Sequence, residues 1–225
     1  MAKTPRPAAA TQPQVQERSL RTREMILDGA LAEFSTKGFD GARIDEIALR
    51  AGVNKNLIYH HFGSKDCLFT ALLERTYEAI RQRQNDLKIR SLDPVEALRK
   101  LVIFTGSVWV QHPEFLRLLQ SENLNSGRHV KGSEKITGMY NPLLNTINDI
   151  LERGVQQGKF REHLDAVDVY ISITSLTAHY ITNAHTFEAI FNRRLLTAER
   201  IKKRLDHAAE MIERYVVKFD SAAAK

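Results

Sequence analysis

Four polar side chains lie close together on one short stretch of the sequence, at Lys55, Asn56, Tyr59 and His60. At helical spacing they share one outward face. Ammonium, amide, phenol and imidazole groups can donate hydrogen bonds to phosphate oxygens or reach base edges in the major groove of DNA. The stretch therefore indicates a surface that binds double-stranded nucleic acid.

The flanking residues supply a frame that would hold these side chains outward. Two short helices are predicted, over residues 44–51 and 54–62. Ala48 is small where the second helix would pack on the first, and Gly52 adopts a positive φ in the turn at little cost. The apolar residues that can seal a core between them are Ile44, Ile47, Val53, Ile58 and Phe62. The pattern is that of a helix-turn-helix; two core helices with a solvated polar face are the alternative.

Most of the remaining sequence has the apolar spacing of amphipathic helices. Thr22 is expected to cap a first helix that Gly38 stops, and Asn54 and Ser64 are expected to cap the helices that follow. Later helices are expected to begin at Pro94, at Pro113, near residue 134 with Pro142 as a kink or restart, at Ala166 (running to about residue 187) and after Thr197, with a loop over 125–134. Because no convincing alternation of period two occurs, the expected fold class is all-α.

Composition limits the class of protein. The 225-residue chain is 43% hydrophobic and 27% charged, as in globular proteins, and its net charge of +6 permits a polyanionic partner. Cys67 is the single cysteine, so an internal disulfide is excluded, and we expect its side chain to be a small buried apolar group. No stretch of about 20 apolar residues and no secretory signal is found, so we expect no membrane partner and a cytoplasmic location.

Residues for catalysis or metal binding do not occur at a suitable spacing. His60 and His61 are adjacent and would point to different faces of a helix, while His179 and His185 are off the spacing that brings two ligands onto one face. Asp165 is better explained as a helix cap, and no glycine-rich phosphate loop is present. We therefore expect neither an enzyme nor a bound metal or other cofactor.

The amino-terminal residues strongly resemble the DNA-binding domain of the TetR (tetracycline-repressor) family. The resemblance covers about residues 20–70 in a fixed register. The residues that carry it are 22–30, Phe34, 37–41, 47–48, 51–53, Tyr59, Phe62, 64–65 and Leu68. It implies a three-helix DNA-binding domain followed by a larger helical domain for effector binding and dimerisation.

The resemblance also implies roles for individual residues. Lys65 matches the family lysine at the start of the fourth helix, which contacts a DNA phosphate. Tyr59 matches the aromatic residue of the recognition helix that contacts the DNA backbone. Lys55 and Asn56 occupy the exposed start of that helix.

Other positions depart from the family pattern. Arg43 stands where Ser or Thr often caps the second helix, and it offers a cation to the DNA backbone. Leu57 stands where Thr or Gly is frequent, and it can touch a thymine methyl group or pack inward. His60 and His61 replace the more usual Arg and Tyr, which predicts that DNA binding tightens as the pH falls.

Three segments are expected: a flexible basic arm over residues 1–19, the DNA-binding domain over 20–66, and the effector-binding and dimerisation domain over 67–225. In the family, the last two helices form the dimer interface. The residues with helical spacing on these helices are Val169, Tyr170, Ile173, Leu176, Thr177, Tyr180, Ile201, Leu205, Ala208, Met211, Ile212 and Tyr215. Ordinary core stripes are the alternative explanation of that spacing.

Polar and aromatic side chains on otherwise apolar helices form a candidate effector pocket. They are Trp109, Tyr140, Asn145, Tyr170, Thr174, His179 and Asn183. The function expected is that of a homodimeric regulator that binds an operator in double-stranded DNA and is released by a small-molecule effector of unknown identity. A helical protein-interaction adaptor and a nonspecific DNA binder remain alternatives.

Overall fold

The computed structural model describes residues 12–218, and side chains from residue 16 onward. The chain divides into two compact units, the first ending at Leu72 and the second beginning at Leu73, each described by itself below. The predicted arm over residues 1–19 falls partly outside the described residues, whereas residues 12–19 belong to the first helix.

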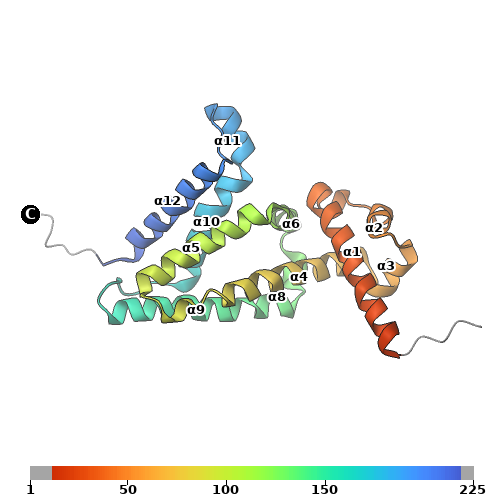
Figure 1. Cartoon of the computed structure of the whole chain (residues 1–225), viewed down its shortest axis with the longest axis horizontal. Coiled ribbons are helices and arrows are strands. Elements are labelled where there is room, and N and C mark those ends of the chain that lie inside the picture. The colour runs from red at the N-terminus through yellow and green to blue at the C-terminus, as the bar shows by residue number, and fades with distance from the viewer. Residues whose placement is uncertain (1–11, 219–225) are drawn as a thin grey trace, which may run out of the picture. The chain divides into compact units, whose positions relative to one another are not determined.

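Helices make up nearly all of the described chain (Figure 1). They are α1 (Gln12–Gly41), α2 (Ile44–Ala51), α3 (Lys55–Phe62), α4 (Lys65–Asn85), the 3-10 helix η1 (Ile89–Ser91), α5 (Pro94–Gln111), α6 (Pro113–Leu124), α7 (Arg128–Lys131), α8 (Glu134–Gly138), α9 (Tyr140–Gln156), α10 (Ala166–Thr182), α11 (Ala184–Phe191) and α12 (Ala198–Val216). Phe160 and Val217 form an isolated antiparallel bridge. The prediction of an all-α fold is confirmed.

The first unit is built around one face of α1. Ile26, Leu27 and Phe34 on that face are fully buried, and α1 packs closely on α2. Gly29 permits this approach, since a Cβ there would lie 3.0 Å from the carbonyl oxygen of Ile47. Gly38, with φ 69° and ψ 177°, interrupts the helical geometry of α1, as predicted.

The second unit is a helical bundle with α5 at its centre. α5 packs against α9, α10 and α12, which can be followed in Figure 1. Gly106 allows α12 and α10 to approach α5, because a Cβ at this position would overlap Leu205 and crowd Thr177. The core residues shared by these helices include Leu98, Leu101, Val102, Ile147, Ile150, Val169, Ile173, Ala208 and Ile212. Much of the apolar stripe on α10 and α12 therefore packs inward.

Several expected helix boundaries are wrong, for identifiable reasons. Thr22 is not a cap, because α1 begins ten residues earlier at Gln12, and the Thr22 hydroxyl instead donates to the carbonyl of Arg18 at 2.9 Å. The expected loop over 125–134 contains α7, whose first turn is held by the carboxylate of Glu122: it accepts N–H bonds from His129 and Val130 at 2.8 and 3.0 Å.

The helix expected over 166–187 is interrupted after Thr182. The side chain of Asn183 donates to the carbonyl of His179 at 3.0 Å, and the chain restarts as α11. At Pro142 the alternative of a restart is confirmed, because Pro142 lies in the first turn of α9, where its missing N–H costs little.

The expectation that Cys67 is buried is also wrong. Cys67 is exposed in the first turn of α4. The neighbouring Leu68, Phe69 and Leu72 are fully buried and occupy the inward face of that helix, so Cys67 falls on the opposite side.

Candidate nucleic-acid interface and cavity

The turn between α2 and α3 has the geometry that its sequence predicts. Gly52 adopts the left-handed conformation, with φ 65° and ψ 32°, and caps α2 through backbone bonds. The side chain of Asn54 accepts the N–H of Leu57 at 2.9 Å, which starts α3. Ala48 and Ile58 are buried where the helices meet. The turn thus fixes the orientation of α3, with Ile58 facing the core and the opposite face of the helix exposed to solvent.

That face carries the side chains expected to contact DNA. Lys55, Asn56 and His60 are exposed, and Tyr59 remains 42% exposed. Leu57 is half-buried, so its methyl groups are partly accessible. The structure brings these residues together on one short helix.

The ammonium group of Lys55 is not free. It forms an ion pair with Asp45 at 3.0 Å, and both side chains are largely exposed. The hydrogen bond and the charge of Asp45 raise the pKa of Lys55 above its ordinary value, so the lysine is a cation at neutral pH. Exposed pairs of this kind are weak, and a DNA phosphate can compete with Asp45 for Lys55.

Arg43 stands at the amino-terminal end of α2 without a side-chain cap. Its guanidinium is exposed, while its backbone N–H donates to Glu33 at 3.4 Å. Glu33 is fully buried on α1 and also pairs with Lys37 and Arg50, at 3.4 and 3.3 Å. Sequence reasoning missed Glu33, which ties the start and the end of α2 to α1.

Lys65 lies in the first turn of α4, which Ser64 caps by accepting the N–H of Cys67 at 3.0 Å. The Lys65 ammonium is 4.8 Å from the centre of the Phe39 ring and 3.4 Å from the carbonyl oxygen of Asp40. These contacts direct a half-buried lysine without neutralising its charge.

His61 differs from His60 in being half-buried. Burial, followed by the charges of His60 and Arg23, lowers the pKa of His61 below its ordinary value. The guanidinium of Arg23 itself lies over the ring of Phe62, 5.3 Å from its centre. The tightening of DNA binding at low pH stays a prediction.

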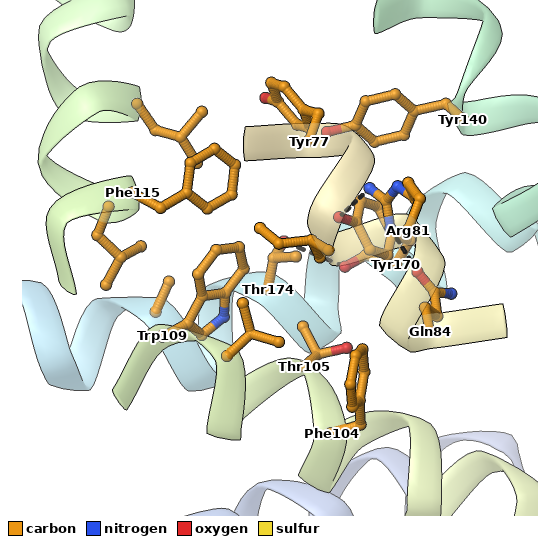
Figure 2. Close-up of a pocket in the computed structure, with 15 residues that line it drawn as sticks. Tyr77, Arg81, Gln84, Phe104, Thr105, Trp109, Phe115, Tyr140, Tyr170 and Thr174 are labelled. Atoms are coloured by element: carbon orange, nitrogen blue, oxygen red, sulfur yellow. Dashed lines mark hydrogen bonds between the residues drawn. The ribbon is translucent and has the colours of Figure 1, made fainter. Parts of the chain in front are cut away.

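A cavity of about 220 Å³ lies within the second unit (Figure 2). It is lined from α4, α5, α6, α9 and α10, with most of its wall apolar or aromatic. The lining residues are Tyr77, Ile80, Arg81, Gln84, Phe104, Thr105, Val108, Trp109, Phe115, Leu116, Leu119, Tyr140, Tyr170, Thr174 and Ala178. Cavities of this composition are typical of small-molecule sites.

Arg81 is the charged side chain in this lining. It donates to Gln84 at 2.5 Å and to the hydroxyl of Tyr170 at 3.3 Å, the bonds drawn as dashed lines in Figure 2. Its guanidinium carbon lies 4.7 Å from the ring centre of Tyr140 and 5.9 Å from that of Tyr170. Its Nε atom is shielded from solvent and has no hydrogen-bond partner.

Tyrosines adjoin Arg81, and aromatic rings continue along the cavity. Tyr140 makes edge-to-face contacts with Tyr77 and Tyr170, at 5.8 and 6.0 Å between ring centres. Burial raises the pKa of all three hydroxyls, that of Tyr170 to about 12, so they stay protonated at neutral pH. Trp109 stacks on Phe115 at 5.8 Å and donates its indole N–H to Thr177 at 3.0 Å.

The candidate pocket residues divide into two groups. Trp109, Tyr140, Tyr170 and Thr174 line the cavity. Asn145 and His179 are exposed, and Asn183 is bonded to the end of α10, so none of these three lines it. The structure therefore places these three outside this cavity, because helical spacing alone does not tell which face of a helix meets α4, and the role of all seven in effector binding stays a prediction.

Sequence reasoning also missed the contribution of α4, including Tyr77, Arg81 and Gln84. An arginine near the end of the helix that follows Ser64 looks, from the sequence, like a solvated charge. Only the packing of α4 near α9 and α10 brings it beside Tyr140 and Tyr170. The apolar pattern of α4 gave a usable signal for Tyr77, which falls on the inward stripe with Leu73.

Among the residues with described side chains, no three His, Cys, Asp or Glu side chains gather as they would around a metal ion. Within that same part of the chain, no helix combines the length and the hydropathy that crossing a membrane requires.

Comparison with known proteins identifies both units. Residues 26–72 match the family of bacterial regulatory proteins of the tetR type, and residues 94–212 match the tetracyclin repressor-like C-terminal domain. The HTH-type transcriptional repressor NicS of Pseudomonas putida is 37% identical over 169 residues, which cover 75% of this chain and 80% of NicS. The HTH-type transcriptional regulator RutR of Escherichia coli is 26% identical over 168 residues, covering 75% and 77%.

Solved structures show the same fold. A TetR transcriptional regulator from Chloroflexus aurantiacus superposes with a TM-score of 0.69 at 21% identity, over 90% of this chain and 100% of that one. With a helix-turn-helix in the first unit, a cavity in the second, and both family matches in place, the chain belongs to the TetR family and is a DNA-binding transcriptional regulator.

Proposed function

We propose that this protein is a homodimeric repressor that binds a specific operator through α3 and leaves it when a small molecule occupies the cavity of the second unit. The observation that supports DNA binding is the exposed face of α3. Its solvent-exposed residues are Lys55, Asn56, Tyr59 and His60. Arg43 and Lys65 add cations that suit phosphate oxygens. NicS, at 37% identity, is named a transcriptional repressor, which supports the direction of control.

Dimerisation is supported by a second apolar face on the helices that the family uses. Val167 and Ile171 on α10 are 46% and 53% exposed, while Met211 and Tyr215 on α12 are 43% and 46% exposed. Each pair is spaced four residues apart and therefore shares a helix face. We expect these faces to be buried against a second copy, because two recognition helices must reach half-sites about 34 Å apart.

The dimer interface can be tested by placing a charge on that face. Ile171→Glu should convert the dimer to a monomer in sedimentation analysis. Glu at the fully buried Ile173, two residues away, should instead unfold the second unit. A dimer that persists in Ile171→Glu would exclude α10 as its interface.

The proposed release is a shift in population between two states. α4 carries Lys65 in its first turn and Arg81 near its last, so one helix has both a proposed phosphate contact and a cavity residue. An effector that prefers a different placement of α4 would lower operator affinity by as much as it prefers that state. Since the proposed partner is chromosomal DNA, we place the protein in the cytoplasm.

The test is a fluorescence-anisotropy titration with the DNA upstream of the protein's own gene, with random duplex as competitor, at two salt concentrations. A regulator of this operator should prefer it over random DNA by about a thousandfold or more. Equal affinity for both would identify a nonspecific binder. Absence of salt-sensitive binding to any DNA would favour a helical adaptor.

A further inference from the structure

We propose that the cavity of the second unit is a site for a small aromatic carboxylate, with Arg81 as the group that binds the carboxylate. The inference rests on the proposed function for the cavity's role as an effector site, but the binding itself can be measured without DNA. It follows from the charge, the hydrogen-bonding capacity, the shape and the size of the cavity.

Arg81 supplies the charge of the cavity. Of the residues that line the cavity, only Arg81 is charged, and its hydrogen-bond partners in the described part of the chain are the neutral side chains of Gln84 and Tyr170. The rings of Tyr140 and Tyr170 stabilise the cation through cation–π contacts, while its Nε atom has no hydrogen-bond partner. A half-buried cation without a counter-charge is less stable than a paired one, so an anionic ligand would supply the missing counter-charge.

A carboxylate fits the hydrogen-bond donors around Arg81. The guanidinium is planar and suits the two oxygens of a carboxylate. The hydroxyls of Tyr77, Tyr140 and Tyr170 stay protonated because burial raises their pKa, so they can donate to the same oxygens.

The carboxylate of Glu122 acts on the cavity through its charge, but its oxygens already have hydrogen-bond partners. Glu122, whose charge contributes to the raised pKa of Tyr77, is bonded to the ring of His129 at 2.6 Å and to the N–H groups of His129 and Val130. It is therefore held within its own helix-capping network and leaves Arg81 without a counter-charge.

The other residues that line the cavity determine which kind of ring or chain the carboxylate is attached to. Away from Arg81 the cavity is lined by Phe104, Trp109, Phe115 and Leu119, as Figure 2 shows for the labelled rings. Flat apolar walls favour an aromatic ring by stacking and edge contacts. A cavity of about 220 Å³ is only modestly larger than one of about 150 Å³ that holds benzene. The ligand class is therefore a single ring with one carboxylate.

The experiment uses the purified full chain and its single tryptophan, Trp109, as an internal probe. Benzoate and 4-hydroxybenzoate are titrated with fluorescence and calorimetric detection, and benzamide serves as the neutral analogue of the same shape. We expect at least one carboxylate to bind at least about tenfold more tightly than benzamide, because only the anion gains the charge-assisted bond. Equal binding of benzamide, or no binding of either carboxylate, would overturn the inference using the wild-type protein alone.

Variants then assign the anion to Arg81. Arg81→Met keeps an unbranched apolar chain but removes the guanidinium, and it should abolish the preference for carboxylate over benzamide. Arg117→Met removes the same charge from an exposed position of α6 outside the cavity lining and should leave the preference intact. A preference that survives in Arg81→Met, with a circular dichroism spectrum like that of the wild type, would also overturn the assignment.

Parallel anisotropy with the upstream DNA separates this inference from the proposed function. Carboxylate binding without specific binding to the upstream DNA would uphold the site and refute the proposed operator. Specific DNA binding without carboxylate binding would refute the site and uphold the regulator.

Discussion

Lys65 offers a quantitative test of the proposed DNA contact, through Lys65→Ala. Its ammonium lies 4.8 Å from the Phe39 ring centre and 3.4 Å from the Asp40 carbonyl, a long hydrogen bond. A partly exposed cation–π contact contributes about 0.5–1 kcal/mol, so the variant should lose no more than about 1 kcal/mol of unfolding free energy and stay folded. Any large loss of DNA affinity must then come from the missing phosphate contact.

The size of that loss follows from counterion release. Each phosphate contact contributes about 0.9 to the slope of log K against log salt concentration, so a dimer with two copies of Lys65 should lose about 1.8. Between 50 and 200 mM salt, the affinity of the variant should fall about twelvefold less than that of the wild type. Binding to specific and random DNA should weaken alike, since phosphates carry no sequence information.

Anisotropy titrations at four salt concentrations measure the slope directly. Lys65→Arg retains the charge and should keep the slope of the wild type. If Lys65→Ala leaves the slope unchanged while urea unfolding shows an intact first unit, Lys65 does not contact phosphate and the reasoning fails.

Other perturbations test the packing, the pH dependence and the ion pair of the recognition helix. Gly154→Ala would place a Cβ 2.0 Å from the ring of Phe160. Because this clash outweighs the higher helix propensity of Ala, the variant should lower the unfolding free energy of the second unit by about 2 kcal/mol and its Tm by several degrees. Gly138→Ala, where a Cβ meets nothing within 4 Å, should be neutral or stabilising. Burial lowers the pKa of His61 below 6.5, so the unfolded chain binds the proton more readily and the unfolding free energy should fall as the pH drops below about 6.5. In urea titrations, His61→Gln should lose less stability than the wild type over this pH range. An equal loss in both proteins would contradict the role of His61. Asp45→Asn frees the lysine at the start of α3 and should tighten binding to all DNA with a steeper salt slope by up to about 0.9 per protomer, whereas an unchanged slope would show that this lysine makes no phosphate contact.

The helix-turn-helix could be predicted from local sequence because its determinants are local. Gly52 supplies the positive φ, Asn54 caps the second helix, and Ala48 permits close packing, all within a few residues. The same locality explains why the helix start at Pro94, the cap at Asp165 and the helix after Thr197 are found where the sequence places them. Such signals depend on the backbone conformation of neighbouring residues rather than on a distant partner.

Local signals failed where a distant or competing contact decides the outcome. The loop expected over 125–134 became partly helical because Glu122 holds the N–H groups of His129 and Val130. Cys67 was expected inside, yet the inward face of α4 is taken by Leu68 and its neighbours. In both cases, residue type alone was a poor guide to environment.

The sequence by itself determined an all-helical chain, the recognition helix and the class of partner that its exposed polar residues suit. Only the tertiary structure decided which side chains enclose a cavity, because that depends on how α4, α5, α6, α9 and α10 pack. It places Arg81 beside Tyr140 and Tyr170, and it leaves Asn145 and His179 at the surface. Helical periodicity tells which residues share a face, whereas the partner of that face is set by contacts between helices far apart in the chain.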